Sequence, residues 1–142
     1  MRYGYSILAA ATVFVATSAS AFEAVTLADY TGEELFGRFC AACHGPSAHG
    51  DGPVARSLTK VVPDLTTISR RYGEFPAERV RDTIDGRNLV DEHGTRVMPV
   101  WGYEFWVEEG GDVIAQREMR DVIKRLVEYV RSLQQETAGS RN

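Results

Sequence analysis

Cysteine and histidine are both scarce in this sequence, which limits the metal and redox chemistry that it can support. Its 142 residues include two cysteines, Cys40 and Cys43, and three histidines, at positions 44, 49 and 93. A structural zinc site needs a second Cys or His pair at finger-like spacing, and these residues do not supply one. A thioredoxin-like pair needs a βαβ context, and no run with period-two alternation surrounds the cysteines. The sequence therefore argues against both kinds of site.

Basic clusters, internal repeats and low-complexity tracts are also lacking. The chain has 16 Lys and Arg residues against 20 Asp and Glu, for a formal net charge of −4, and its basic residues are dispersed. Because nucleic-acid binding needs a clustered basic surface, we expect no nucleic-acid partner. A chain of this length without repeats is expected to form one small domain.

The stretch around which the sequence is organised is Cys40-Ala41-Ala42-Cys43-His44. It is the C-x-x-C-H signature of covalent c-type haem attachment. Each thiol adds to a vinyl group on one edge of the porphyrin, and the adjacent histidine is held where its nitrogen can bind iron. We therefore expect one covalent haem c, bound through Cys40 and Cys43, with His44 as an iron ligand. The alternative is an exported module in which the two cysteines form a disulfide.

The beginning of the chain is typical of a secretory signal peptide. Met1 to Ala21 carries one charge, Arg2, followed by an apolar run, and closes with the A-x-A pattern Ala19-Ser20-Ala21. We expect cleavage before Phe22, which leaves residues 22–142 as one exported, periplasmic domain with no membrane span. An uncleaved anchor is the alternative, because the uncharged stretch is almost long enough to cross a bilayer.

Helical patterns dominate the mature sequence. Thr31 and Glu34 form a capping box, which predicts a helix from about Gly32 into the cysteine motif. Gly32 in the first turn costs helix stability, so we expect it to contact another element closely. The strongest periodicity predicts a helix from about Ala115 to Gln134. Its expected buried stripe is Met119, Val122, Ile123, Leu126, Val130 and Leu133.

Shorter elements are expected between these two helices, each marked by proline, threonine or glycine. They are a short helix over about 53–58, an extended stretch over 61–65, a short helix capped by Thr66 or Thr67 that ends near Tyr72, and a helix from Pro76 to Gly86. A long loop is predicted from Gly86 to Trp101. The aromatic residues that follow, Trp101, Tyr103, Phe105 and Trp106, are expected to be core or haem-wall residues rather than a nucleic-acid stacking platform, because no basic groove accompanies them.

Met98 is the candidate for the second axial ligand of the iron. It lies in the long loop directly before Pro99, which restricts its backbone to extended geometry. The other methionine of the mature chain, Met119, belongs to the buried stripe. A thioether is soft and neutral, so its pairing with His44 suits electron transfer. Three alternatives stay open, namely ligation by His93, a Met98 that only fills a gap in the core, and an open distal position.

These residues together resemble class I (mitochondrial-type) monohaem cytochromes c of the bacterial exported kind, over nearly all of residues 30–134. The resemblance implies a mainly α fold, with about three to five helices around one covalently bound haem and with crossing N- and C-terminal helices. The positions at which the family's two helices pack match Gly32, Phe36, Leu126 and Tyr129.

The resemblance also implies further haem contacts. The family's Pro-x-Leu element matches Pro63-Asp64-Leu65, so the Pro63 carbonyl is expected to accept a hydrogen bond from His44 and Leu65 to pack on the ring. The haem-propionate partners do not follow from the family pattern. The candidates are Arg87, Arg96 and Trp101, because guanidinium and indole groups are suitable hydrogen-bond donors for carboxylates. Each is equally typical of a surface or core residue.

The function implied by the resemblance is one-electron transfer rather than enzyme catalysis. We expect either a soluble carrier or the cytochrome subunit of a larger complex, with a dehydrogenase, a cytochrome complex or a terminal oxidase as the redox partner. The second hypothesis is a haem-based sensor or small-ligand enzyme, in which the distal position opens for NO, CO or peroxide. The state of the Met98 ligand distinguishes the two.

Overall fold

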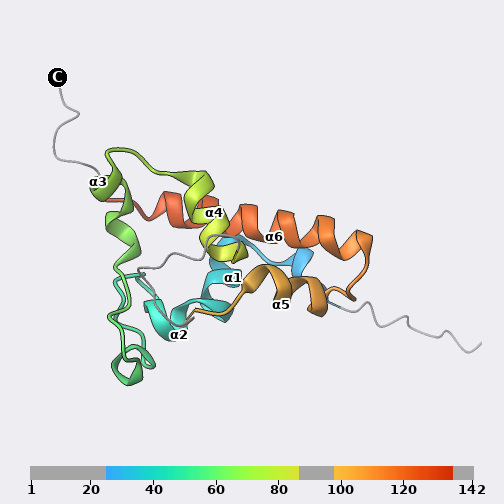
Figure 1. Ribbon diagram of the computed structural model, residues 1–142, viewed down its shortest axis with the longest axis horizontal. Coiled ribbons are helices and arrows are strands. Elements are labelled where there is room, and N and C mark those ends of the chain that lie inside the picture. The colour runs from blue at the N-terminus through green and yellow to red at the C-terminus, as the bar shows by residue number, and fades with distance from the viewer. Residues whose placement is uncertain (1–24, 87–97, 136–142) are drawn as a thin grey trace, which may run out of the picture.

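The computed structural model describes residues 25–86 and 98–135, and the regular elements of this part of the chain are all helices or helical turns (Figure 1). Its elements in chain order are the 3-10 turn η1 (Leu27–Asp29), α1 (Gly32–Phe39), α2 (Ala41–His44), η2 (Ala55–Ser57), η3 (Leu65–Thr67), α3 (Ile68–Tyr72), α4 (Ala77–Asp85), α5 (Trp101–Glu108) and α6 (Val113–Ser132). None of these described helices has the length and apolar character to cross a membrane. The expected signal peptide, residues 1–21, lies outside the described residues.

Helix α1 begins where the sequence predicts. The Glu34 amide donates to the Thr31 hydroxyl at 3.2 Å, and the Thr31 amide donates to the Glu34 carboxylate at 2.7 Å. This is the expected capping box, and it satisfies backbone donors that a helix start leaves without partners. The helix ends at Phe39, and Cys40 separates it from the single turn of α2.

The N- and C-terminal helices cross in close contact, as the resemblance implies. A Cβ added at Gly32 would lie 2.5 Å from the Arg125 carbonyl oxygen and 2.9 Å from the Tyr129 Cβ. The Phe36 and Tyr129 rings lie 5.4 Å apart, centroid to centroid. The backbones therefore approach as closely as they do because residue 32 has no side chain. Figure 1 shows α1 lying alongside α6.

Helix α6 supplies the largest share of the core. Asp112 caps it, since its carboxylate accepts from the amides of Ile114 and Ala115 at 2.8 Å each, so the helix starts at Val113 rather than at the expected Ala115. The predicted stripe is confirmed, with Leu133 partly buried at its end. The buried members are Met119, Val122, Ile123, Leu126 and Val130.

The main departure from expectation is α5, a helix where the sequence predicted none. Its aromatic side chains hold it against α1, since the Phe39 ring lies 5.4 Å from that of Trp101 and 5.0 Å from that of Phe105. Phe105 is fully buried. With α5 and the separate turn α2, the described residues contain six α-helices, compared with about three to five expected. The mainly α class and the helix crossing are as predicted.

The middle of the chain follows the predicted order with two corrections. The short helix expected over 53–58 is only the 3-10 turn η2. Thr67 stands at the N-cap of α3 but makes no capping bond with its side chain; the capping side chain is that of Asp64, which starts η3 by accepting from the Thr66 amide at 2.8 Å. Helix α4 ends as predicted at Gly86, whose φ of +85° is left-handed.

Candidate functional site

The two cysteines and the histidine of the C-x-x-C-H motif share one helical turn. The amide of His44 donates to the Cys40 carbonyl at 2.9 Å, which closes α2 over the motif. Cys40 is buried and Cys43 half-buried, and neither forms a disulfide. Burial, and secondarily the neighbouring Cys43, raise the pKa of the Cys40 thiol to about 12. Cys40 is therefore held as a neutral thiol.

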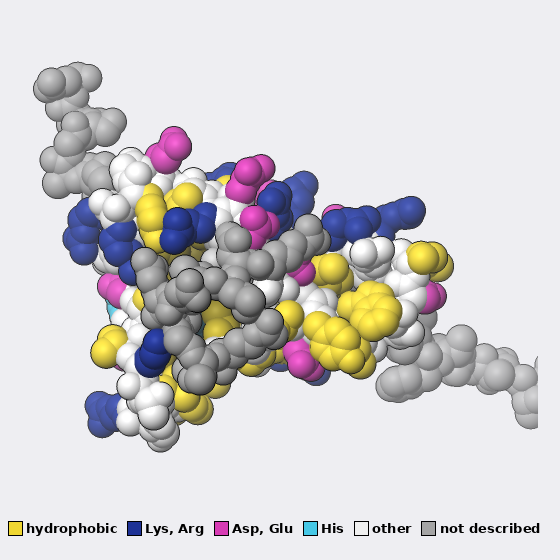
Figure 2. Space-filling view, in the orientation of Figure 1, with side chains coloured by type: hydrophobic (Ala, Val, Ile, Leu, Met, Phe, Trp, Pro, Cys, Tyr) yellow, Lys and Arg dark blue, Asp and Glu magenta, His cyan; other side chains and the backbone are white. Residues whose placement is uncertain are grey.

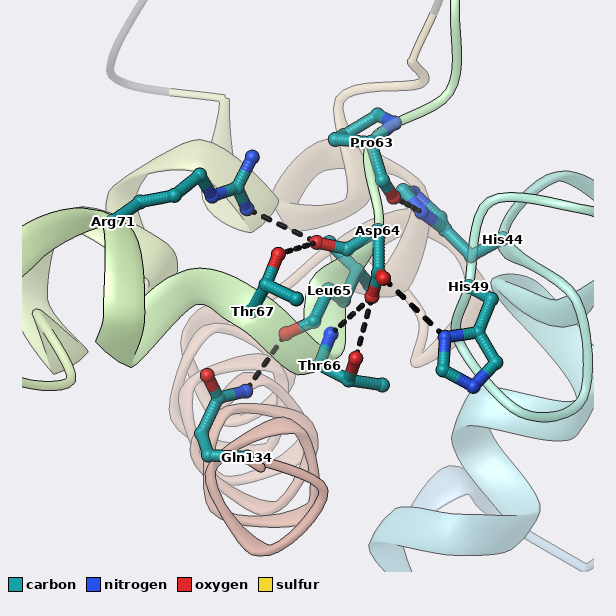
Figure 3. A network of polar contacts seen from close by, with 9 residues as sticks. All are labelled: His44, His49, Pro63, Asp64, Leu65, Thr66, Thr67, Arg71 and Gln134. Atoms are coloured by element: carbon teal, nitrogen blue, oxygen red, sulfur yellow. Dashed lines mark hydrogen bonds and ion pairs between the residues drawn. The ribbon is translucent and has the colours of Figure 1, made fainter. Parts of the chain in front are cut away.

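The imidazole of His44 is buried, with an exposed fraction of 9%. Its Nδ1 atom lies 3.3 Å from the carbonyl oxygen of Pro63 (Figure 3). Because a carbonyl oxygen only accepts hydrogen bonds, Nδ1 is the donor in this contact and the ring lone pair lies on Nε2. The segment after the motif thus fixes both the orientation and the tautomer of the ring, and it leaves Nε2 as the atom suited to binding a metal.

The segment that carries Pro63 is held from both sides. On one side the Leu65 amide donates to the Ala48 carbonyl at 2.8 Å, in the loop that follows the motif. On the other side Gln134, just beyond α6, donates from Nε2 to the Leu65 carbonyl at 2.7 Å. Gln134 also accepts from the Ser69 amide at 2.8 Å. The contact of Pro63 with His44 therefore depends on the end of the C-terminal helix (Figure 3).

Asp64 is a functional residue that the sequence did not single out. Its carboxylate accepts from the Thr66 hydroxyl at 2.6 Å and lies 3.3 Å from Nδ1 of His49. The guanidinium of Arg71 donates to the Asp64 carbonyl at 3.1 Å. His49, in the loop after the motif, therefore faces a carboxylate. An Asp two residues before a Thr, at a chain bend, was the signal that could have identified this cap.

Met98, Leu65 and Trp101 are each half-buried and pack against one hydrophobic cluster, to which Cys40 also belongs. The Trp101 ring stacks on Phe105 with centroids 5.5 Å apart, so Trp101 serves the α1–α5 contact. Arg87, Arg96 and His93 lie outside the described residues. The structure thus brings Cys40, Cys43, His44 and Pro63 together directly, and it places Leu65, Met98 and Trp101 on the same core.

This donor set fits a covalently held haem. A His/Met haem c uses two thiols, one imidazole and one thioether. The structure has two thiols on one turn, an oriented imidazole beside them and a thioether on the adjoining core. The apolar residues of the shared cluster suit a porphyrin ring. Within residues 25–86 and 98–135, no group of three or more His, Cys, Asp or Glu side chains gathers as it would around a bare metal ion.

Comparison with known proteins agrees with this assignment. The sequence model of the family described as cytochrome c matches residues 30–134. The match includes every residue of the motif, the Pro63 segment and Met98. Comparison with curated proteins and with solved structures gave no match.

Proposed function

The chain belongs to the cytochrome c family, and from that premise we propose that it transfers single electrons through one haem c held by Cys40, Cys43, His44 and Met98. When bound, the haem supplies an iron that accepts and releases one electron. The two cysteines would anchor the haem through thioether bonds. His44 and Met98 would be the protein ligands of the iron, which would leave no open position for a substrate.

The observation that carries this proposal is the 3.3 Å contact of the His44 Nδ1 atom with the Pro63 carbonyl. A hydrogen bond to the second ring nitrogen raises the basicity of a histidine ligand and fixes its plane. The ring is buried, so water does not compete for this bond. A histidine directly after a C-x-x-C turn needs both features to serve as a permanent ligand.

Met98 is proposed as the second ligand from its place in the chain and on the core. Pro99 restricts the backbone of Met98, and Met98 packs on the cluster that includes Cys40. A thioether ligand favours ferrous iron relative to a second imidazole, and so it raises the reduction potential. We further propose that Leu65 supplies an apolar haem contact. The proposed propionate partners are Arg87, Arg96 and Trp101.

The proposed compartment is the periplasm, reached through a signal peptide over residues 1–21 and cleavage before Phe22. The support is the apolar run and the Ala19-Ser20-Ala21 pattern. There the protein would serve as a soluble carrier or as the cytochrome subunit of a complex. Its redox partner would be a dehydrogenase, a cytochrome complex or a terminal oxidase.

The test is the visible absorption spectrum of protein made in an export host that attaches haem. We expect a c-type spectrum with a weak sulfur-to-iron band in the oxidised form, and no CO binding by the reduced form. Met98→Ala is expected to abolish the band and open the iron to CO. Met119→Leu, a matched change in the buried stripe, is expected to keep the band.

Rapid CO binding by the wild-type protein would instead favour the sensor or small-ligand enzyme. A sulfur band that survives in Met98→Ala would contradict ligation by this residue. A haem-free protein would contradict the proposed function as a whole.

A further inference from the structure

The end of the molecule formed by α5 and the start of α6 carries exposed apolar side chains. Figure 2 shows them gathered at the end where α5 turns into α6. The exposed fractions are 59% for Tyr103, 49% for Val107, 82% for Val113 and 61% for Ile114. With the half-buried Trp106, these residues define what we term the α5–α6 surface. Scattered single apolar residues are common on proteins, whereas a cluster of this kind marks a contact site.

Trp106 packs against the core, but the fold does not require the four exposed members of this surface. Helix α5 buries Gly102 and Phe105, and α6 buries Ala115 and Met119 in its first turns. Tyr103, Val107, Val113 and Ile114 lie off both buried stripes. On the outer face of an amphipathic helix, polar residues are the rule. The apolar character of the α5–α6 surface therefore needs an explanation other than packing within the chain.

The aromatic members of the surface are fixed in place before any partner arrives. The Trp106 indole N–H donates to the Asp112 carbonyl at 3.0 Å. The Tyr103 ring lies 6.0 Å from the Trp106 ring, centroid to centroid. Trp and Tyr are the residues that most often dominate binding energy at interfaces. Holding them in one orientation lowers the entropy lost on association.

The charge around the surface indicates what kind of partner it accepts. Residues 101–121 contain six acidic and two basic side chains, a net charge of −4 that equals the formal net charge of the whole chain. Partial burial, and then the neighbouring carboxylates of Glu109, Asp112 and Asp121, raise the pKa of Glu118. One cation from α1 approaches this end, since Arg38 lies 3.6 Å from Glu108. An excess of carboxylates beside an apolar surface repels a second copy of itself and attracts basic groups.

We propose that the α5–α6 surface binds a partner protein whose contact face combines apolar side chains with lysine or arginine. It deepens the proposed function by favouring a cytochrome subunit held by a fixed partner over a free carrier. Val107 lies near the end of α5 and Val113 and Ile114 open α6, away from Trp101 at the start of α5, whereas Tyr103 lies in the first turn of α5 (Figure 1). A partner centred on the turn between α5 and α6 would leave the proposed haem-attachment face open for electron exchange.

The test uses the haem-loaded protein and a synthetic amphipathic helix with a Leu/Phe face flanked by lysines, measured by calorimetric titration. We expect Val113→Ser with Ile114→Ser to weaken binding at least about tenfold, because truncation of interface anchors has effects of this size. Tyr103→Ser is expected to act in the same direction. Val61→Ser is the matched control, since Val61 is 95% exposed and lies in a different segment, and it is expected to bind like wild type.

The charges are tested separately. Glu104→Gln with Glu108→Gln is expected to weaken binding and to flatten its salt dependence, because both changes remove rim charges. A helix of the same apolar face flanked by glutamates is expected not to bind. Equal binding of the lysine and glutamate helices, or equal binding by Val61→Ser and the Val113/Ile114 variant, would overturn the proposal.

Two other binding partners of the α5–α6 surface would be recognised by separate measurements. Self-association in sedimentation that Val113→Ser with Ile114→Ser abolishes would identify a second copy instead. Binding to phosphatidylcholine vesicles that is lost in the Val113/Ile114 variant would identify a membrane instead. The haem spectrum of every variant reports whether the protein is folded. It also separates the docking proposal from the proposed electron-transfer function, because absence of peptide binding with an intact c-type spectrum contradicts only the docking surface.

Discussion

A single carboxylate, Asp64, links three parts of the site. It caps the turn that starts η3, it faces His49 from the loop after the motif, and its own carbonyl accepts from Arg71. Asp64 directly follows Pro63, whose carbonyl contacts His44. A substitution at Asp64 therefore affects Pro63, which orients His44, without removing a side chain that contacts His44.

The pH dependence of the Asp64 contribution has a definite sign. Partial burial raises the pKa of this carboxyl, but hydrogen bonds from the Thr66 hydroxyl and amide, and from His49, outweigh it and bring the pKa below the usual 3.8. The unfolded chain then binds the proton more readily, so the contribution is present above about pH 4 and is lost as the pH falls through the folded-state pKa. We expect Asp64→Asn to be less stable than wild type at neutral pH, and the gap to close on acidification.

Urea unfolding of the haem-loaded protein across this pH range measures the effect. Glu74→Gln, a neutralised carboxylate at an exposed position, is the control and should give a much smaller gap. A gap for Asp64→Asn that stays constant down to about pH 3 would contradict the linkage.

At the scale of elements, the contact between α1 and α6 depends on the absence of a side chain at one position. Gly32 lies against the Arg125 carbonyl and Tyr129, whereas Gly37, on the same helix, has nothing within 4 Å of where its Cβ would be. One glycine is thus required for packing, and the other only costs helix stability. The same substitution at the two positions separates these effects.

We expect Gly32→Ala to destabilise the haem-loaded protein by about 1–3 kcal/mol, because the added methyl forces the helices apart. Gly37→Ala is expected to be neutral or to stabilise by up to about 1 kcal/mol, from helix propensity alone. Denaturant midpoints followed by circular dichroism give both values. Equal destabilisation by the two variants would show that the close approach at Gly32 does not limit packing.

Elements whose signal is local were predictable from the sequence. The capping box of Thr31 and the long stripe of α6 were both predicted and found, because adjacent residues alone specify them. Helix α5 was missed because it lacks a side-chain N-cap, and its aromatic residues are held by Phe39, far away in sequence. Tertiary packing determined its structure, and local propensity did not.

The candidate site also has parts that the sequence predicted and parts that it did not. The C-x-x-C-H motif followed from a short sequence pattern and the Pro63 carbonyl contact from the family resemblance, and the structure contains both arrangements. The hydrogen bond from Gln134 to the Leu65 carbonyl could not be predicted, because a glutamine at a helix end has no signature that identifies a partner near residue 65. Ligation by Met98 stays a prediction, as do the roles of Arg87 and Arg96.

At the scale of the whole molecule, the proposed haem would add a large apolar surface to a modest core. Cys40, Leu65, Met98 and Trp101 share one hydrophobic cluster, and the segment from the motif to α3 contains only short helical turns. A small domain with this little regular structure in its middle depends on a bound group for apolar burial.

We therefore expect Cys40→Ala with Cys43→Ala, made without attached haem, to have less helix and a lower, broader melting transition than the haem-loaded protein. Hydrogen exchange should be slowest in α1 and α6, which pack on each other, and fastest over residues 45–72. Circular dichroism and amide exchange measure both. A sharp transition at the temperature of the haem-loaded protein would show that the polypeptide folds without the cofactor.

The hydrogen bonds of Gln134 have a consequence for the order of events during maturation. Gln134, just beyond α6, holds the Leu65 carbonyl, and α6 itself packs closely on α1. The segment that places Pro63 beside His44 is therefore completed only when the last helix docks. We expect attachment of the proposed haem after export to precede this docking, while Cys40 and Cys43 are still accessible.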